Sequence, residues 1–254
     1  MSKLSAARTW VGRHRERLLL AAVLAVSSVV ALGVLALRIA YTGTAGYSFM
    51  VWNLFLAWIP LWLAAAIAVV GRGGRRAFGL VAGLGMVWLL FFPNAPYLLT
   101  EFIHLDADYA VRERPVRLLA GVSPGKAAPA WYDAALILMF AWNGLLLAFV
   151  SLHLVQQVVR RLAGAAWSWA AAVIVLALSA FGMSIGRFQR WNSWDLFSRP
   201  TELLADVMGR MLNPIDHPRT TAVTVIFGSF LLMAYLAVQA IGRMTNDETR
   251  MTNQ

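Results

Sequence analysis

Residues 91–106 of the chain read FFPNAPYLLTEFIHLD. The stretch begins inside a long apolar run and ends in a glutamate, a histidine and an aspartate. A second polar stretch, residues 186–196, reads GRFQRWNSWDL and also follows an apolar run. We expect the two stretches to emerge on the same side of a membrane. Any active or binding site is predicted where they meet.

The composition of the whole chain supports a membrane protein. Of its 254 residues, 60% are hydrophobic and 13% are charged, whereas soluble domains carry about 25% charged residues. The chain has no cysteine, which excludes disulfides, thiolate nucleophiles and cysteine-ligated metal centres. Its net charge of +10 is concentrated in segments between apolar runs. This distribution indicates membrane orientation rather than nucleic-acid binding.

Six apolar runs are long enough to cross a bilayer, which takes about 20 residues per helix. The sequence therefore predicts an all-α, six-transmembrane helix bundle in a single domain, residues 18–242, between tails at 1–17 and 243–254. The first run is longer than the core of a signal peptide and lacks a cleavage site of small residues, so it is expected to be retained. The predicted spans are about 18–40, 47–70, 77–100, 131–157, 167–188 and 220–241.

Three features within the spans predict contacts between helices. Gly79 with Gly83, and Gly182 with Gly186, have the spacing of small residues that allows helix backbones to approach closely in lipid. Asn143 near mid-depth is expected to make a hydrogen bond between helices. Arg38, at the end of the first run, is expected to extend its guanidinium to the interface.

An amphipathic helix is predicted in the last long loop. Residues 198–202 resemble a helix start, with a proline in the first turn, and Asn213 followed by Pro214 ends the pattern. Asp206 and Arg210 have a favourable i, i+4 spacing on the polar side. We expect the helix to lie on the membrane surface or over the bundle. The apolar side consists of Leu203, Leu204, Val207, Met208, Met211 and Leu212.

The distribution of charge predicts the orientation. The tails and the short loops hold twelve basic and three acidic residues, against ten basic and nine acidic in the remaining segments. Basic residues in short loops orient a membrane protein most strongly, so both termini are predicted to be cytoplasmic. The strong preference for arginine over lysine suggests a bacterial genome, and hence the bacterial inner membrane. The lipid bilayer is the expected partner; a membrane-protein partner or a second copy of the chain is an alternative.

Pro93 and Pro96 interrupt the third span. Each removes a backbone donor, which frees the carbonyls of Leu89 and Phe92, and in lipid these acceptors need partners within the protein or in a water-filled cavity. Asn94 is well placed to satisfy them. One interpretation is a kink that Asn94 caps locally; the other is an unwound segment that lines a binding cavity, as in broken-helix transporters.

Glu101 and His104 stand three residues apart, which places them on one helix face. Such a pair holds metals in helix bundles, and Asp106 would add an oxygen ligand for a divalent metal. With Asp195, the pair could instead perform acid–base catalysis. The non-catalytic alternative is that His104 lies at the membrane interface and Glu101 forms a salt bridge with an arginine.

The second stretch offers two arginines close to the lipid. Arg187 and Arg190 either form salt bridges with Glu101, Asp133 or Asp195, or clamp a phosphate or carboxylate. The tryptophans beside them fit an aromatic belt at the interface. The full set of predicted ligand-binding residues is Asn94, Tyr97, Arg187, Arg190, Trp191, Asn192 and Trp194.

Together, residues 92–105 and 186–195 resemble a bacterial membrane-protein family known as domain of unknown function 1361. The resemblance covers about residues 20–242 and implies a polytopic membrane protein with no assigned activity. In the family pattern the carboxylate before the histidine is usually aspartate. Glu101 keeps that charge on a longer side chain.

Three functions remain open from the sequence. The first is an enzyme that acts on an envelope or lipid-linked substrate at the outer face. The second is a transporter or small-ligand binder that uses the break at Pro93 and Pro96. The third is an accessory subunit whose outer loops dock a partner. Six spans without an inverted repeat make the second less favoured.

Overall fold

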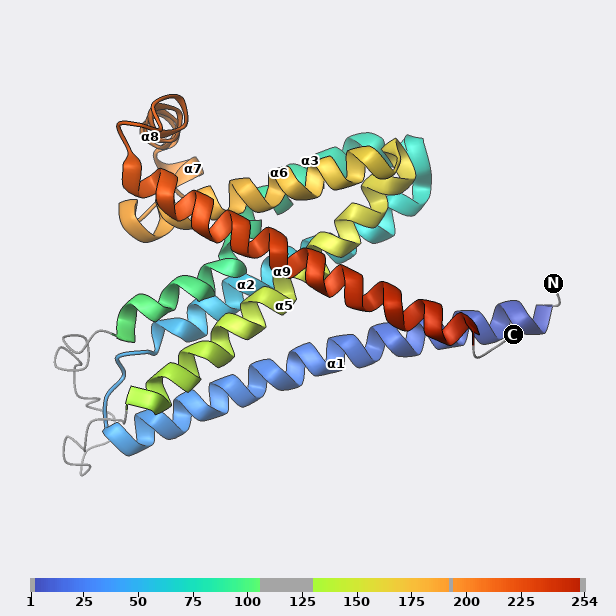
Figure 1. Cartoon of the computed structure of the whole chain (residues 1–254), viewed down its shortest axis with the longest axis horizontal. Coiled ribbons are helices and arrows are strands. Elements are labelled where there is room, and N and C mark those ends of the chain that lie inside the picture. Colours follow the sequence, from blue (N-terminus) through green and yellow to red (C-terminus); the bar gives the residue numbers. More distant parts are fainter. Residues whose placement is uncertain (1–2, 106–129, 192–193, 252–254) are drawn as a thin grey trace. The chain divides into compact units, whose positions relative to one another are not determined.

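The computed structural model describes residues 3–105, 130–191 and 194–251. Within these residues the chain is helical and contains no strand (Figure 1). The α-helices are α1 (Lys3–Thr42), α2 (Phe49–Val70), α3 (Phe78–Phe91), α5 (Ala130–Ala163), α6 (Ala165–Ser184), α7 (Asp195–Ser198), α8 (Pro200–Leu212) and α9 (Pro218–Met251). Shorter helical turns are the 3-10 segments η1 (Gly71–Ala77), η2 (Phe92–Asn94) and η3 (Pro96–Leu105), and the π-helical η4 (Ile185–Gln189).

The six predicted spans are confirmed as six helical segments of sufficient length and hydropathy to cross a membrane. The third span differs from a simple α-helix, because α3 passes through η2 into η3 at the two prolines. The observed segments are Leu18–Thr42, Phe49–Gly74, Phe78–Leu105, Ala130–Ala163, Ala165–Gln189 and Pro218–Met244.

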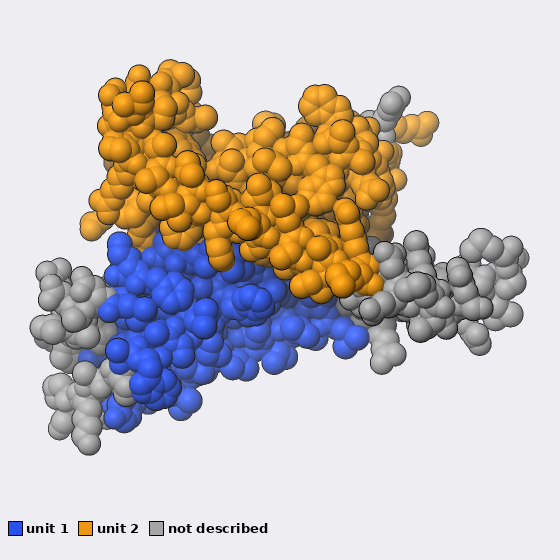
Figure 2. All heavy atoms as spheres, viewed as in Figure 1, with its two compact units in different colours: residues 1–56, 97–147 blue, residues 57–96, 148–254 orange. Residues whose placement is uncertain are grey.

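The chain forms two compact units (Figure 2). Unit 1 comprises residues 1–56 and 97–147, and unit 2 comprises residues 57–96 and 148–254. Helices α2 and α5 each contribute residues to both units. The single domain that the sequence predicts for residues 18–242 stays a prediction.

The core of unit 1 combines apolar packing with hydrogen bonds between α1 and α5. Asn143, which is 2% exposed, accepts from the Ser27 hydroxyl at 2.6 Å and from the Ser28 hydroxyl at 3.1 Å. The predicted interhelical role of Asn143 is therefore confirmed. Buried apolar side chains complete this core, among them Leu24, Ala31, Leu35, Met50, Leu54, Leu136, Ile137 and Phe140.

In unit 2, α6 packs along α9, and small residues set how closely segments approach. A β-carbon on Gly182 would lie 2.9 Å from Pro93 Cγ, so this glycine is needed where α6 meets the proline break. The expectation for the other glycine pair was wrong. No described atom outside their own helix lies within 4 Å of a β-carbon placed on Gly79 or Gly83.

The predicted amphipathic helix is α8, and the proline at its first turn is confirmed. Asp206 Oδ1 lies 2.9 Å from Arg210 Nε on its polar side. None of its residues is buried, and Leu204, Met208 and Met211 are each about half exposed. An apolar face exposed in this way suits a helix that rests against lipid.

Candidate functional site

The proline break is closed by local hydrogen bonds. Asn94 Nδ2 donates to the Phe91 carbonyl at 2.9 Å, and the backbone N–H of Ala95 donates to the Phe92 carbonyl at 3.2 Å. Asn94 therefore forms a local cap, which was one of the two interpretations of the sequence. Its acceptor is the Phe91 carbonyl rather than the expected carbonyls of Leu89 and Phe92. The tighter 3-10 geometry shifts the bonding register by one residue, and Phe92 is satisfied by the backbone.

Beyond the break, η3 brings Glu101 and His104 together. In a 3-10 helix residues three apart lie directly above one another, and Glu101 Oε2 lies 3.3 Å from His104 Nε2. The other carboxylate oxygen, Oε1, accepts from Asn53 Nδ2 of α2 at 2.8 Å. The Glu101 side chain is completely buried. Asn53 fixes one of its oxygens by a hydrogen bond, and the other lies within ion-pair distance of the imidazole without hydrogen-bond geometry.

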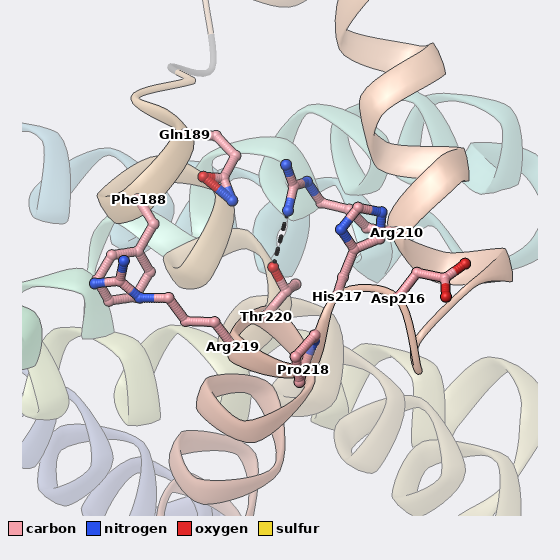
Figure 3. A pocket seen from close by; sticks show the side chains of 8 residues that line it. All are labelled: Phe188, Gln189, Arg210, Asp216, His217, Pro218, Arg219 and Thr220. Carbon is pink, nitrogen blue, oxygen red and sulfur yellow. Dashed lines mark hydrogen bonds between the residues drawn. The ribbon is translucent and has the colours of Figure 1, made fainter.

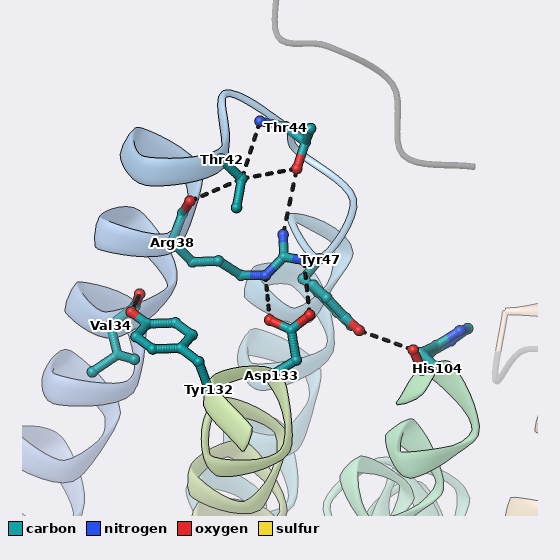
Figure 4. A network of polar contacts seen from close by, with 8 residues as sticks. All are labelled: Val34, Arg38, Thr42, Thr44, Tyr47, His104, Tyr132 and Asp133. Carbon is teal, nitrogen blue, oxygen red and sulfur yellow. Dashed lines mark hydrogen bonds and ion pairs between the residues drawn. The ribbon is translucent and has the colours of Figure 1, made fainter. Parts of the chain in front are cut away.

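His104 is the exposed member of this pair. Its side chain is 23% exposed, while the Phe49 ring contacts the imidazole edge-on with centroids 5.1 Å apart. The Tyr47 hydroxyl donates to the His104 backbone carbonyl at 2.9 Å (Figure 4). The histidine is therefore held at its backbone and at its ring, and part of its side chain remains exposed.

Next to this pair lies a buried ion pair that the sequence interpretation missed. Arg38 donates through Nε and Nη2 to the two carboxylate oxygens of Asp133, at 2.6 and 3.0 Å (Figure 4). Arg38 is only 2% exposed, and its guanidinium lies 4.3 Å from the centre of the Tyr47 ring. The expected extension of Arg38 to the interface was wrong, because Asp133 provides a partner inside the protein.

Tyr47 connects the ion pair to the Glu101–His104 pair, since its ring contacts Arg38 and its hydroxyl contacts the His104 backbone. Asp133 is paired with Arg38, so it is not available as the main partner of Arg187 or Arg190. The sequence did contain an indication of this pairing, because Arg38 and Asp133 both lie at the ends of apolar spans and an ionisable residue in such a span generally faces a partner. We call the connected set the unit 1 polar network: Arg38, Tyr47, Asn53, Glu101, His104 and Asp133.

The second predicted stretch belongs to unit 2. Here α6 passes into the π-helical turn η4. Arg190, the residue after η4, has the left-handed conformation with φ of 60°. Trp191 Nε1 donates to Asp206 Oδ2 at 2.9 Å, and the Trp194 ring contacts Phe91 with centroids 5.3 Å apart. Asp195 pairs with Arg199 at 3.3 Å.

The expected meeting of the two stretches stays a prediction. Glu101 and His104 belong to unit 1, whereas Asn94, Arg187 and Arg190 belong to unit 2. Tyr97 starts the second segment of unit 1, and its carbonyl accepts from the Thr100 hydroxyl at 2.7 Å. Asn192 lies outside the described residues.

The predicted metal site is described only in part. Glu101 and His104 are adjacent, but Asp106 lies outside the described residues. Among the residues that are described, no group of three or more histidine or acidic side chains is arranged to hold a metal ion. Metal binding by Glu101, His104 and Asp106 therefore stays a prediction.

The fold and the polar network define a multi-pass α-helical membrane protein with ionisable groups inside its helical core. The chain belongs to the family described as protein of unknown function DUF1361, whose model matches residues 52–234. The matched region includes Asn53, Glu101, His104 and Asp133, but not Arg38. No curated protein and no solved structure matches the chain.

Proposed function

We propose that this protein is a membrane-embedded enzyme that acts on a lipid-linked or envelope substrate, with Glu101 and His104 as its acid–base pair. One observation carries the proposal: a completely buried carboxylate contacts a partly exposed imidazole at the end of a membrane-spanning segment. Ionisable side chains at such depth are costly and usually functional.

The two residues would divide the work between them. Asn53 holds one oxygen of Glu101 by a hydrogen bond, and the other oxygen lies 3.3 Å from His104 Nε2. A carboxylate in that position can orient an imidazole. His104, the exposed partner, would take a proton from the attacking group of the substrate and return it to the leaving group.

Side chains of the second polar stretch, residues 186–196, would recognise the substrate. The guanidinium groups of Arg187 and Arg190 suit a phosphate or carboxylate, and Trp191 and Trp194 would provide apolar surface. Asp195 is the candidate second carboxylate. Its carboxylate contacts the Ser198 hydroxyl at 3.2 Å and Arg199 at 3.3 Å, and the Asp195 side chain is 14% exposed. Asn94, Tyr97 and Asn192 complete the proposed set.

A divalent metal is the alternative basis for the same chemistry. Glu101 and His104 supply an oxygen and a nitrogen ligand, and Asp106 would supply another oxygen. Carboxylate and imidazole ligands of this kind are common in catalytic metal centres. Transport through the proline break has less support, because the carbonyls of Phe91 and Phe92 already accept local hydrogen bonds.

We also propose that the protein lies in a bacterial inner membrane with both termini in the cytoplasm, as the basic residues of the tails and short loops favour. An alkaline phosphatase reporter fused after residue 110 is expected to be active, because that enzyme folds only outside the cytoplasm. A fusion after residue 73 serves as the control and is expected to be inactive. The reverse pattern would overturn the orientation.

The enzymatic proposal is tested by comparing the envelope lipids of cells with and without the gene by mass spectrometry. Cells that lack it are expected to accumulate one lipid-linked species, and the wild-type gene should remove it. A copy encoding Glu101→Gln, which keeps the shape of the side chain and removes its charge, should not. Complete restoration by Glu101→Gln at equal protein level would reject the acid–base role.

A further inference from the structure

Unit 2 contains a cavity of about 260 Å³ that none of the preceding proposals uses (Figure 3). It lies among η4, the end of α8 and the first turn of α9. Its polar lining consists of Gln189, Arg210, Asp216, His217, Arg219 and Thr220. A cavity with two guanidinium groups, an imidazole, an amide and a hydroxyl has the donors that an oxyanion requires.

Arg210 is held in place by three neighbours. Its Nε contacts Asp206 at 2.9 Å and its Nη1 donates to the Thr220 hydroxyl at 3.2 Å (Figure 3). The Gln189 amide, oriented so that both of its ends are satisfied, accepts from the same Nη1 at 2.9 Å. Thr220 is itself only 4% exposed. The guanidinium is thus positioned before any ligand arrives, which lowers the entropic cost of binding.

Arg219 provides a positive charge at the cavity that is not neutralised by an ion pair within the described residues. Its guanidinium stacks on the Phe188 ring at 3.9 Å (Figure 3), and it makes no ion pair with any residue that the structure describes. The charge of Arg210 is matched by Asp206. The carboxylate of Asp216 points away from the side of the cavity where Arg219 and Gln189 lie (Figure 3). The dipole of α9 adds positive potential at its first turn.

We propose that this cavity binds the phosphate group of an anionic ligand, either a phospholipid headgroup or a soluble phosphate ester. A guanidinium fork matches phosphate geometry, and the Thr220 hydroxyl and His217 ring provide further donors. The surroundings suit a headgroup, since Leu212 and Ile215, which are close in sequence to the lining residues Arg210 and Asp216, are 70% and 90% exposed. Arginine side chains at the end of a membrane helix can bind the phosphate of a lipid headgroup. This proposal does not depend on the acid–base role of Glu101 and His104.

Two binding measurements on the full chain test the proposal. In the first, native mass spectrometry counts phosphatidylglycerol retained by protein from nanodiscs of phosphatidylcholine and phosphatidylglycerol. In the second, calorimetry follows glycerol phosphate binding to protein in uncharged detergent. Arg219→Gln is expected to weaken binding roughly tenfold, as for loss of one charge-assisted contact. Thr220→Val, which changes no charge, should weaken it by a smaller factor.

Arg243→Gln is the matched control, because Arg243 lies on the same helix and its guanidinium also stacks on an aromatic ring, that of Trp169 at 5.8 Å. This variant is expected to bind like the wild type. Loss in the lipid measurement alone identifies a headgroup site, and loss with glycerol phosphate alone identifies a soluble ester. Equal losses in Arg219→Gln and Arg243→Gln, or no loss in either cavity variant, would overturn the proposal.

Discussion

Replacement of Asp133 by alanine is expected to lower the free energy of unfolding by about 3–5 kcal/mol, the cost typical of breaking a buried ion pair from one side. The reason is the burial of Arg38, which is 2% exposed and donates two hydrogen bonds to that carboxylate. Removing the Asp133 carboxylate leaves the guanidinium charge of Arg38 buried and without this counter-charge. Unfolding in mixed micelles with increasing denaturing detergent, followed by tryptophan fluorescence, measures the change.

Two further variants make the stability experiment decisive. Replacing both residues with apolar side chains, Arg38→Met with Asp133→Leu, should recover most of the loss, because no uncompensated charge remains. Arg199→Ala is the control for removing an ion pair near the surface. Its pair with Asp195 leaves the arginine side chain 52% exposed, so about 1 kcal/mol or less is expected. An Asp133→Ala effect no larger than this control would mean that the ion pair does not stabilise unit 1.

The second large effect is expected at His104. His104→Ala should slow turnover of the lipid-linked species that accumulates in cells without the gene by about 10²–10⁴-fold, the usual contribution of a general acid–base group. Turnover is measured by mass spectrometry in membranes that contain equal amounts of each variant. Because the His104 side chain is 23% exposed, added imidazole should reach the vacated position and restore part of the rate.

His153→Ala is the control for this experiment. His153 is also on a membrane-spanning helix, but its ring nitrogens contact the side-chain amides of Gln157 at 2.7 Å and Gln239 at 2.8 Å. We expect this variant to keep near-wild-type turnover and to show no response to imidazole. Unchanged turnover in His104→Ala would exclude the histidine from the chemistry.

The elements that are encoded locally could be predicted from the sequence. A membrane span requires only a long apolar run, and an amphipathic helix requires only the i, i+3, i+4 spacing of apolar residues. For this reason the six spans and α8 were found close to their observed bounds. The contact between Glu101 and His104 was also predictable, because both lie on one turn of the same segment.

Pairings between distant segments could not be predicted in the same way. Arg38 and Asp133 are 95 residues apart, and the sequence around Arg38 fits extension to the interface as well as it fits burial. The glycine spacing has the same weakness, because it indicates which helix can be approached closely but not by which partner. Gly182 meets Pro93, while Gly79 and Gly83 have open space next to them within the described chain.

The proline break shows a smaller failure of the same kind. The two prolines predicted an interruption of the α-helix, and a local cap by Asn94 was one of two interpretations of it. They did not reveal that the chain continues as 3-10 helix, which moves the accepting carbonyl of the cap to Phe91. The participation of Asn53 was missed as well, because its contact with Glu101 links two different spans.

The central claim is that Glu101 and His104 act as one acid–base unit, and a double-mutant cycle on turnover tests it most directly. The rates of Glu101→Gln, His104→Ala and the double variant are compared with the wild-type rate. Residues that act as a unit have strongly non-additive effects, so the double variant should be no slower than the slower single variant. If the two losses multiply in the double variant, the residues act independently and the account is contradicted.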